Sequence, residues 1–124
     1  MLLATLSGVA ALTYAALASR ILMSELQLGE ALTEATLNRQ YDEMEALLEA
    51  GADVNFRFDG GDTPLHLAVD AGDVTAIRLL LAHGADPNLR SEGMKPSEVA
   101  MDRRVQKLLL DAERVRAPIL DRNR

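Results

Sequence analysis

The apolar residues of this chain form one long run followed by short periodic stripes. The first 19 residues carry no charged side chain, and the apolar run of about 21 residues that ends at Leu22 would form a helix of roughly 31 Å. Farther along, apolar residues recur three or four positions apart, as in Leu65, Ala68 and Val69. That spacing is typical of helices with one buried face. The pattern therefore predicts an all-α protein with a distinct N-terminal helix.

Three interpretations of the N-terminal run are open. A transmembrane anchor over residues 1–23 fits a hydrocarbon core of about 30 Å. A cleaved signal peptide is suggested by the small-x-small triplet Ala16-Leu17-Ala18, although no Lys or Arg precedes the run. The third interpretation is a buried cap helix that lies on the helical stack, but a helix that is apolar on all sides suits a membrane better. We favour the anchor, with an exported, periplasmic protein as the alternative.

The run also contains a stripe of small residues with four-residue spacing. Small residues let helix backbones approach closely in lipid, so we expect the stripe to pack against another membrane helix. It comprises Ser7, Ala11, Ala15 and Ser19, with Gly8 beside it. The first charge, Arg20, lies near the C-terminal end of the run and favours a cytoplasmic location for the rest of the chain.

An internal repeat follows this segment. Gly51-Ala52-Asp53 recurs as Gly84-Ala85-Asp86, a shift of 33 residues, and the apolar positions before each triplet align at the same shift. A period of this length indicates stacked structural units that cannot bury their apolar faces alone.

Local signals place two helices in the central unit. Thr63 can cap a helix start, and Pro64 fits the first turn because it has no N–H to satisfy. Gly72 permits the left-handed residue that ends this helix. Asp73 can cap the second helix, and Gly84 can end it.

The central unit resembles an ankyrin repeat along its whole length. The matching residues are Gly61, Thr63-Pro64-Leu65-His66, Ala68, Gly72, Leu79-Leu80-Leu81 and Gly84-Ala85-Asp86. The resemblance implies a solenoid of about three helix–turn–helix units over residues 26–116, followed by a polar tail, 117–124. The units are 26–58, 59–90 and a shortened cap, 91–116.

The terminal units depart from the pattern. The first has Glu30-Ala31-Leu32-Thr33 where Thr-Pro-Leu-His is expected. The third has Lys95-Pro96 one residue early and lacks three residues before Leu108-Leu109-Leu110. We expect a shortened turn between its two helices, as terminal repeats need not keep every stacking residue.

Composition excludes several functions. The chain has no Cys and two His, so disulfides and thiolate metal sites are excluded. A pI near 4.8 and a net charge of −6 argue against nucleic acid as partner. The charge is uneven, with eight acids and one base over residues 21–53 and nine bases and six acids over residues 90–124, which can steer a partner.

Candidate chemistry is sparse. His66 and Asp70 lie four residues apart, but two ligands make a poor zinc site and no Ser or Cys nucleophile accompanies the histidine. The resemblance implies instead that His66 hydrogen-bonds to a neighbouring turn and ties repeats together. Gly60-Gly61 lacks the surroundings of a phosphate loop. We expect no cofactor, metal or small-molecule substrate, and a small enzyme or metal protein is the least supported alternative.

The resemblance implies binding of other proteins through hairpin tips and the inner face of the first helices. The residues at those places are Phe56, Arg57, Phe58, Asp59, Asp62, Asp70, Ala71, Arg90 and Glu92. Aromatic residues and Arg are enriched in binding hot spots. We therefore expect a non-enzymatic, single-pass membrane-tethered protein-interaction module that serves as an accessory or assembly subunit of a larger membrane complex.

Overall fold

A computed structural model describes residues 2–116, with side chains for residues 13–18 and 23–116. Six helices make up this part of the chain, and its only pairing outside them is an isolated bridge between Ser91 and Met94. The helices are α1 (Leu2–Leu37), α2 (Tyr41–Glu49), α3 (Pro64–Asp70), α4 (Val74–Ala82), α5 (Pro96–Val99) and α6 (Arg103–Arg116). The expected all-α architecture is confirmed.

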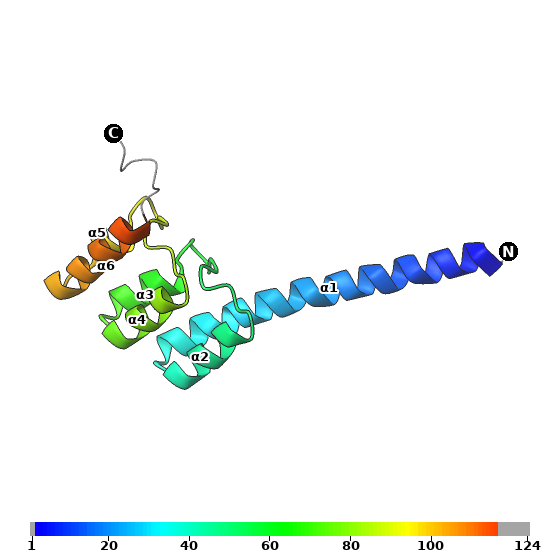
Figure 1. Cartoon of the computed structure of the whole chain (residues 1–124), viewed down its shortest axis with the longest axis horizontal. Coiled ribbons are helices and arrows are strands. Elements are labelled where there is room, and N and C mark those ends of the chain that lie inside the picture. Colours follow the sequence, from blue (N-terminus) through cyan, green and yellow to red (C-terminus); the bar gives the residue numbers. More distant parts are fainter. Residues whose placement is uncertain (1, 117–124) are drawn as a thin grey trace.

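The helices form three stacked pairs, α1–α2, α3–α4 and α5–α6 (Figure 1). The first helices of successive pairs contact one another, α1 with α3 and α3 with α5, and α2 contacts α4. The core runs continuously through the stack because each pair buries its apolar face against the next. Its fully buried large apolar side chains are Leu32, Met44, Leu65, Ile77, Leu80 and Leu109.

The predicted starts and ends of the central helices are confirmed. The Thr63 hydroxyl accepts a hydrogen bond from the backbone N–H of His66, and Pro64 is the first residue of α3. The Asp73 carboxylate accepts from the N–H of Ala76 at 3.2 Å and so caps α4. Gly72 has a φ of 62°, a left-handed value that suits glycine.

The first pair has an unusually long first helix. Within the described part of the chain, no break separates residues 2–23 from the first repeat, because α1 is one helix from Leu2 to Leu37. The sequence offers no Thr-Pro start signal at Glu30, so nothing interrupts the helix there. The turn after α1 places Arg39, which corresponds to Gly72 at the 33-residue shift, at a φ of 56°. The first repeat thus keeps the turn geometry of the second without its glycine.

The third pair corrects one expectation. The link between α5 and α6 is Ala100–Asp102, as long as the Ala71–Asp73 link between α3 and α4. The three missing residues come instead from the first helix, since α5 has 4 residues and α3 has 7. The shared Asp explains the conserved link length: Asp102 Oδ1 accepts from the N–H of Arg104 at 2.7 Å and starts α6, as Asp73 starts α4.

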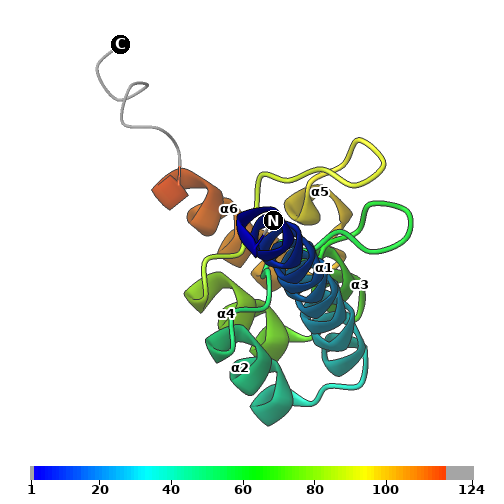
Figure 2. The ribbon, with the colours of Figure 1, turned by 90° about the vertical axis from the view of Figure 1, so that its right-hand side faces the viewer.

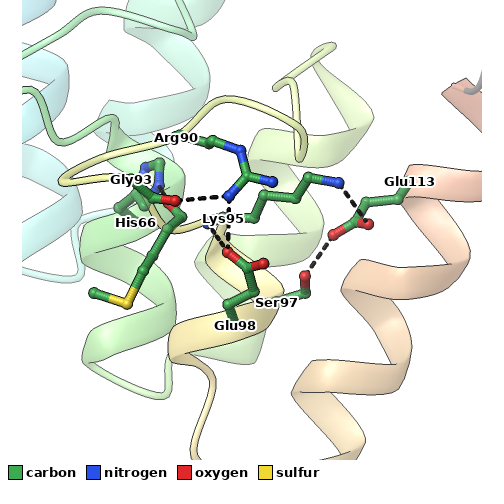
Figure 3. Close-up of polar contacts among 8 residues, drawn as sticks. His66, Arg90, Gly93, Lys95, Ser97, Glu98 and Glu113 are labelled. Carbon is green, nitrogen blue, oxygen red and sulfur yellow. Dashed lines mark hydrogen bonds and ion pairs between the residues drawn. The ribbon is translucent and has the colours of Figure 1, made fainter.

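Polar contacts hold the short α5 against α6 (Figure 3). The Ser97 hydroxyl donates to Glu113 Oε1 at 2.5 Å, and Lys95 Nζ lies 3.5 Å from Glu113 Oε2. Ser97 is buried and Glu113 is mostly shielded from solvent. A carboxylate with a hydroxyl and an ammonium partner is stabilised in such a setting, which compensates for the small apolar contact of a one-turn helix.

Further polar contacts join the first pair to the second. The Tyr41 hydroxyl lies 3.1 Å from both carboxylate oxygens of Asp73, and Arg39 Nε lies 3.9 Å from Oδ2 of the same residue. Burial, and then the Asp73 carboxylate, raise the pKa of Tyr41 above its ordinary value. Asn55 Oδ1 accepts from the backbone N–H of Asp86 at 2.8 Å. These contacts fix the offset between the two repeats.

The N-terminal part of α1 extends away from the stacked pairs (Figure 1, blue). Within the described part of the chain, no helix carries an apolar stretch long enough to cross a membrane. The expected membrane segment, 1–23, and the expected packing residues Ser7, Gly8, Ala11 and Ser19 fall mainly on side chains outside the described ones. Ala15 of that stripe is exposed.

Candidate functional site

Two long connections end in tight tips that project on the same side of the stack (Figure 2). In the first, residues 58–62, the N–H of Phe58 donates to the carbonyl of Asp62 at 2.9 Å. In the second, residues 91–94, Ser91 and Met94 exchange two backbone hydrogen bonds of 2.9 Å each. The φ values of Glu92 (48°) and Gly93 (82°) are those of a two-residue hairpin turn. The second tip is one residue shorter than the first, which explains why Lys95-Pro96 stands one residue earlier than the repeat pattern places it.

The side chains of the two arginines at the tips form hydrogen bonds to backbone carbonyls. Arg57 Nη1 donates to the carbonyl of Gly61 at 2.8 Å and to that of Arg90 at 2.9 Å. Arg90 Nη1 donates to the carbonyl of Gly93 at 2.6 Å and lies 3.3 Å from Glu98 Oε2 (Figure 3). Each guanidinium thus closes its own tip, and Arg57 also ties the first tip to the second.

A hollow of about 300 Å³ opens between α3, α5 and the second tip. Its lining residues are Asp62, His66, Leu67, Asp70, Ser91, Glu92, Met94 and Val99. No described residue forms a hydrogen bond or ion pair with the side-chain carboxylates of Asp62, Asp70 and Glu92. We call this hollow the groove. It combines three unpaired carboxylates with apolar walls.

His66 forms the floor of the groove. It is 5% exposed, its Nδ1 lies 2.8 Å from the Thr63 hydroxyl, and its Nε2 lies 3.3 Å from the carbonyl of Met94. The carbonyl can only accept, so Nε2 carries the proton and Nδ1 accepts from Thr63. Burial lowers the pKa of His66 below its ordinary value, which keeps the ring neutral at pH 7. The expected role is confirmed: His66 ties the second repeat to the turn of the third.

The two phenylalanines have different environments. Phe56 is partly buried with its ring against Gly29 of α1, where an added Cβ would lie 2.3 Å from the ring. Phe58 is 44% exposed at the first tip. Phe56 therefore packs the first tip onto α1, and Phe58 is the one that a partner can reach.

The remaining predicted residues lie at different places on the described part of the molecule. Asp59 is exposed at the first tip, and Ala71 is exposed in the α3–α4 turn, where its carbonyl accepts from Arg39 at 3.4 Å. Asp62, Asp70 and Glu92 meet in the groove. Sequence reasoning missed the apolar wall made by Leu67, Met94 and Val99. The sequence did not indicate Met94 as a wall residue because the third unit departs from the repeat pattern.

Metal binding finds no support in the described residues. No group of three or more His, Cys, Asp or Glu side chains lies close enough together there to hold a metal ion. His66 uses both ring nitrogens in hydrogen bonds to Thr63 and Met94.

Known proteins match part of the chain. A family profile described as three copies of ankyrin repeats matches residues 18–91. Human 2-5A-dependent ribonuclease is 48% identical over 62 residues, which is 49% of this chain and 8% of that protein. Zygote-specific protein 3 of Chlamydomonas reinhardtii is 44% identical over 61 residues, 49% of this chain and 16% of that protein.

A cation channel is among the relatives as well. Human transient receptor potential cation channel subfamily A member 1 is 42% identical over 57 residues, 43% of this chain and 5% of the channel. The chain spans less than a fifth of each of these three proteins. The similarity therefore concerns the repeats. Since the profile covers more than half of the chain and the helix pairs stack as repeats, the chain belongs to the ankyrin-repeat family.

Proposed function

We propose that this chain binds another protein through the groove, and that the partner inserts a lysine or arginine from an extended basic segment. Ankyrin repeats indicate an interaction module. The observation that carries the proposal is the set of unpaired carboxylates, Asp62, Asp70 and Glu92, around one hollow. The nearby cations, Arg57 and Arg90, already donate to backbone carbonyls.

The shape of the groove suits a long cationic side chain. Lys and Arg place their aliphatic stems on apolar surface and keep the charged head near polar groups. Leu67 and Met94 offer the apolar wall, and Met94 is 45% exposed. His66 is neutral at pH 7 because burial lowers its pKa, so the groove floor contributes no opposing positive charge. Phe58, Asp59 and the exposed part of Arg57 would form the rim of the contact.

Peptide binding by the full chain tests this proposal. The probe is a fluorescein-labelled extended peptide rich in Lys and Arg, compared with a neutral peptide of equal length. The variant Asp62→Asn/Asp70→Asn/Glu92→Gln is expected to bind the basic peptide at least about tenfold more weakly. The variant Glu43→Gln/Glu45→Gln/Glu49→Gln, with the same change in charge on exposed α2 positions, is expected to bind like the parent. Equal loss in both variants would rule out the groove.

We also propose that residues 1–23 tether the module to a membrane as a single span, with the repeats on the cytoplasmic side. Support comes from the absence of charge in the first 19 residues and from the way α1 extends beyond the repeats. A tether would place the groove near a larger membrane complex, for which the chain would serve as an accessory or assembly subunit. Resistance to sodium carbonate extraction is expected, and release into the soluble fraction would contradict the tether.

If the chain is exported instead, the protein recovered from cells should have a lower mass. Cleavage after the triplet Ala16-Leu17-Ala18 would remove about 18 residues, as a signal peptidase does. Intact mass spectrometry of the protein recovered from cells is expected to give the uncleaved chain. A mass lower by that segment would replace the tether with the exported alternative.

A further inference from the structure

The inner side of α1 carries an acidic position one helix away from the groove. The first helices of the first two pairs, α1 and α3, pack side by side (Figure 2). Leu32 of α1 and Leu65 of α3 stand 33 residues apart, and both are buried in the core at 0% and 1% exposure. The same shift brings Glu34 to the position of Leu67, which lines the groove. Glu34 therefore lies on the same inner side of the stack, one repeat earlier.

A second glutamate, Glu30, lies one turn before Glu34 on α1. Both side chains are exposed, and neither carboxylate forms a hydrogen bond or ion pair within the described part of the chain. Like charges four residues apart on a helix repel each other. Arg39, the base in the turn after α1, is already bound to Asp73 and to the carbonyl of Ala71. A cation from outside the described chain would relieve the repulsion.

Leucines stand between the acidic positions of the two helices. Leu37, which is 58% exposed, takes the position of Asp70 one repeat earlier, and Leu67 takes that of Glu34 one repeat later. The carboxylates of Glu34 and Asp70 thus lie on one diagonal of this four-residue surface, and the leucines lie on the other. Such a surface fits a segment in which apolar residues separate two cationic ones.

We propose that the basic segment of the partner carries two lysine or arginine residues at positions i and i+3, one for the groove and one for the Glu30–Glu34 pair. This inference rests on the proposed binding of a basic segment in the groove. The spacing follows from the distance between neighbouring helices, which is about 8–10 Å. In a polyproline helix, residues i and i+3 lie on the same side and about 9 Å apart.

The distances in a β-strand fit less well. Residues on one side of a strand are about 7 Å apart at i+2 and about 13 Å apart at i+4, and neither value matches the helix spacing. The segment therefore binds in the polyproline conformation, with proline or another apolar residue between the two cations.

Fluorescence anisotropy with the full chain in detergent micelles tests the spacing. The probe is a fluorescein-labelled peptide of proline and alanine with two lysines at i and i+3. Two peptides of the same composition place the lysines at i+2 and i+4, and a fourth peptide has a single lysine. The i+3 peptide is expected to bind about fivefold more tightly than each of the others, the upper range for an exposed ion pair.

The variant Glu30→Gln/Glu34→Gln is expected to abolish the preference for the i+3 peptide and to change the affinity for the single-lysine peptide by less than about twofold. The variant Glu43→Gln/Glu49→Gln makes the same change in charge at exposed α2 positions and should keep the preference. Circular dichroism establishes that both variants keep their helical content.

The groove variant Asp62→Asn/Asp70→Asn/Glu92→Gln separates this inference from the proposed function. If it weakens binding of the single-lysine peptide, but the parent binds all four peptides alike, the two-cation inference alone is overturned. The same holds if the i+3 preference survives in Glu30→Gln/Glu34→Gln. If the groove variant binds the single-lysine peptide as the parent does, the proposed function fails, and this inference fails with it.

Discussion

The Arg57 guanidinium donates a 2.9 Å hydrogen bond to the carbonyl of Arg90, the residue that occupies the same position one repeat later. Each of these arginines also closes its own tip through a carbonyl, Gly61 for Arg57 and Gly93 for Arg90. The contact joins the two tips that border the groove. It makes the spacing of the tips a property of the fold, independent of any partner.

Arg57→Ala is expected to lower the free energy of unfolding by about 1 kcal/mol, since a charged donor to two carbonyls is lost at an exposed site. Urea denaturation measures this change. Arg78→Ala is the matched control, because Arg78 is exposed on α4 and has no hydrogen-bond or ion-pair partner among the described residues. Equal stability of the two variants would contradict the structural role of Arg57.

Gly29→Ala is expected to destabilise the chain by roughly 1–3 kcal/mol, as overpacking does, because the new Cβ would lie 2.3 Å from the Phe56 ring. In the Phe56→Ala background the same change should become neutral or stabilising, since alanine favours a helix over glycine by about 1 kcal/mol. A double-mutant cycle by urea denaturation measures the coupling. Additive effects would show that the ring does not lie over Gly29.

Stability is expected to fall as the pH drops below the ordinary His66 pKa of 6.5. Burial lowers the folded-state pKa of His66, so the unfolded chain takes up the proton first. The stability contributed by the neutral ring is complete above pH 6.5 and is lost as the pH falls through the folded-state value, with a slope of at most about 1.4 kcal/mol per pH unit.

Urea denaturation at pH 7.5 and pH 5.5 checks this dependence. His66→Gln should reduce the difference in stability between the two pH values. A pH dependence that is the same in His66→Gln as in the parent would assign the effect to other groups.

Leu109→Ala is expected to cost about 2–4 kcal/mol because the side chain is fully buried and a cavity would remain. Leu110→Ala, one residue later and 41% exposed, should cost far less. Thermal unfolding of both variants tests whether α6 belongs to the common core. If the two substitutions have similar effects, the third pair is not packed on the stack as described.

Much of the fold follows from local signals in the sequence. Thr63-Pro64 and Asp73 begin the central helices where capping chemistry predicts. The third repeat was harder to predict, because a gap of three residues between aligned positions does not show which element is shorter. Asp102 starts α6 after a link of full length, so α5 is the shortened element.

The candidate site was less predictable because its contacts join residues far apart in the chain. Arg57 suggested a partner contact, but its acceptor is the carbonyl of Arg90, 33 residues later. The sequence does not distinguish the environments of Phe56 and Phe58, because Gly29 of α1, which contacts only the Phe56 ring, is far away in the chain. The carboxylates Asp62, Asp70 and Glu92 were predicted residue by residue, but their meeting in one groove depends on how α3 and the second tip stack.

The most direct test of the central claim is an NMR titration of the ¹⁵N-labelled full chain in micelles with the basic peptide. The account predicts saturable shifts of the amide signals of Leu67, Asp70, Glu92 and Met94, with little change on α2. Shifts centred on Asp42, Glu45 and Glu49 of α2, with the groove signals unchanged, would contradict it.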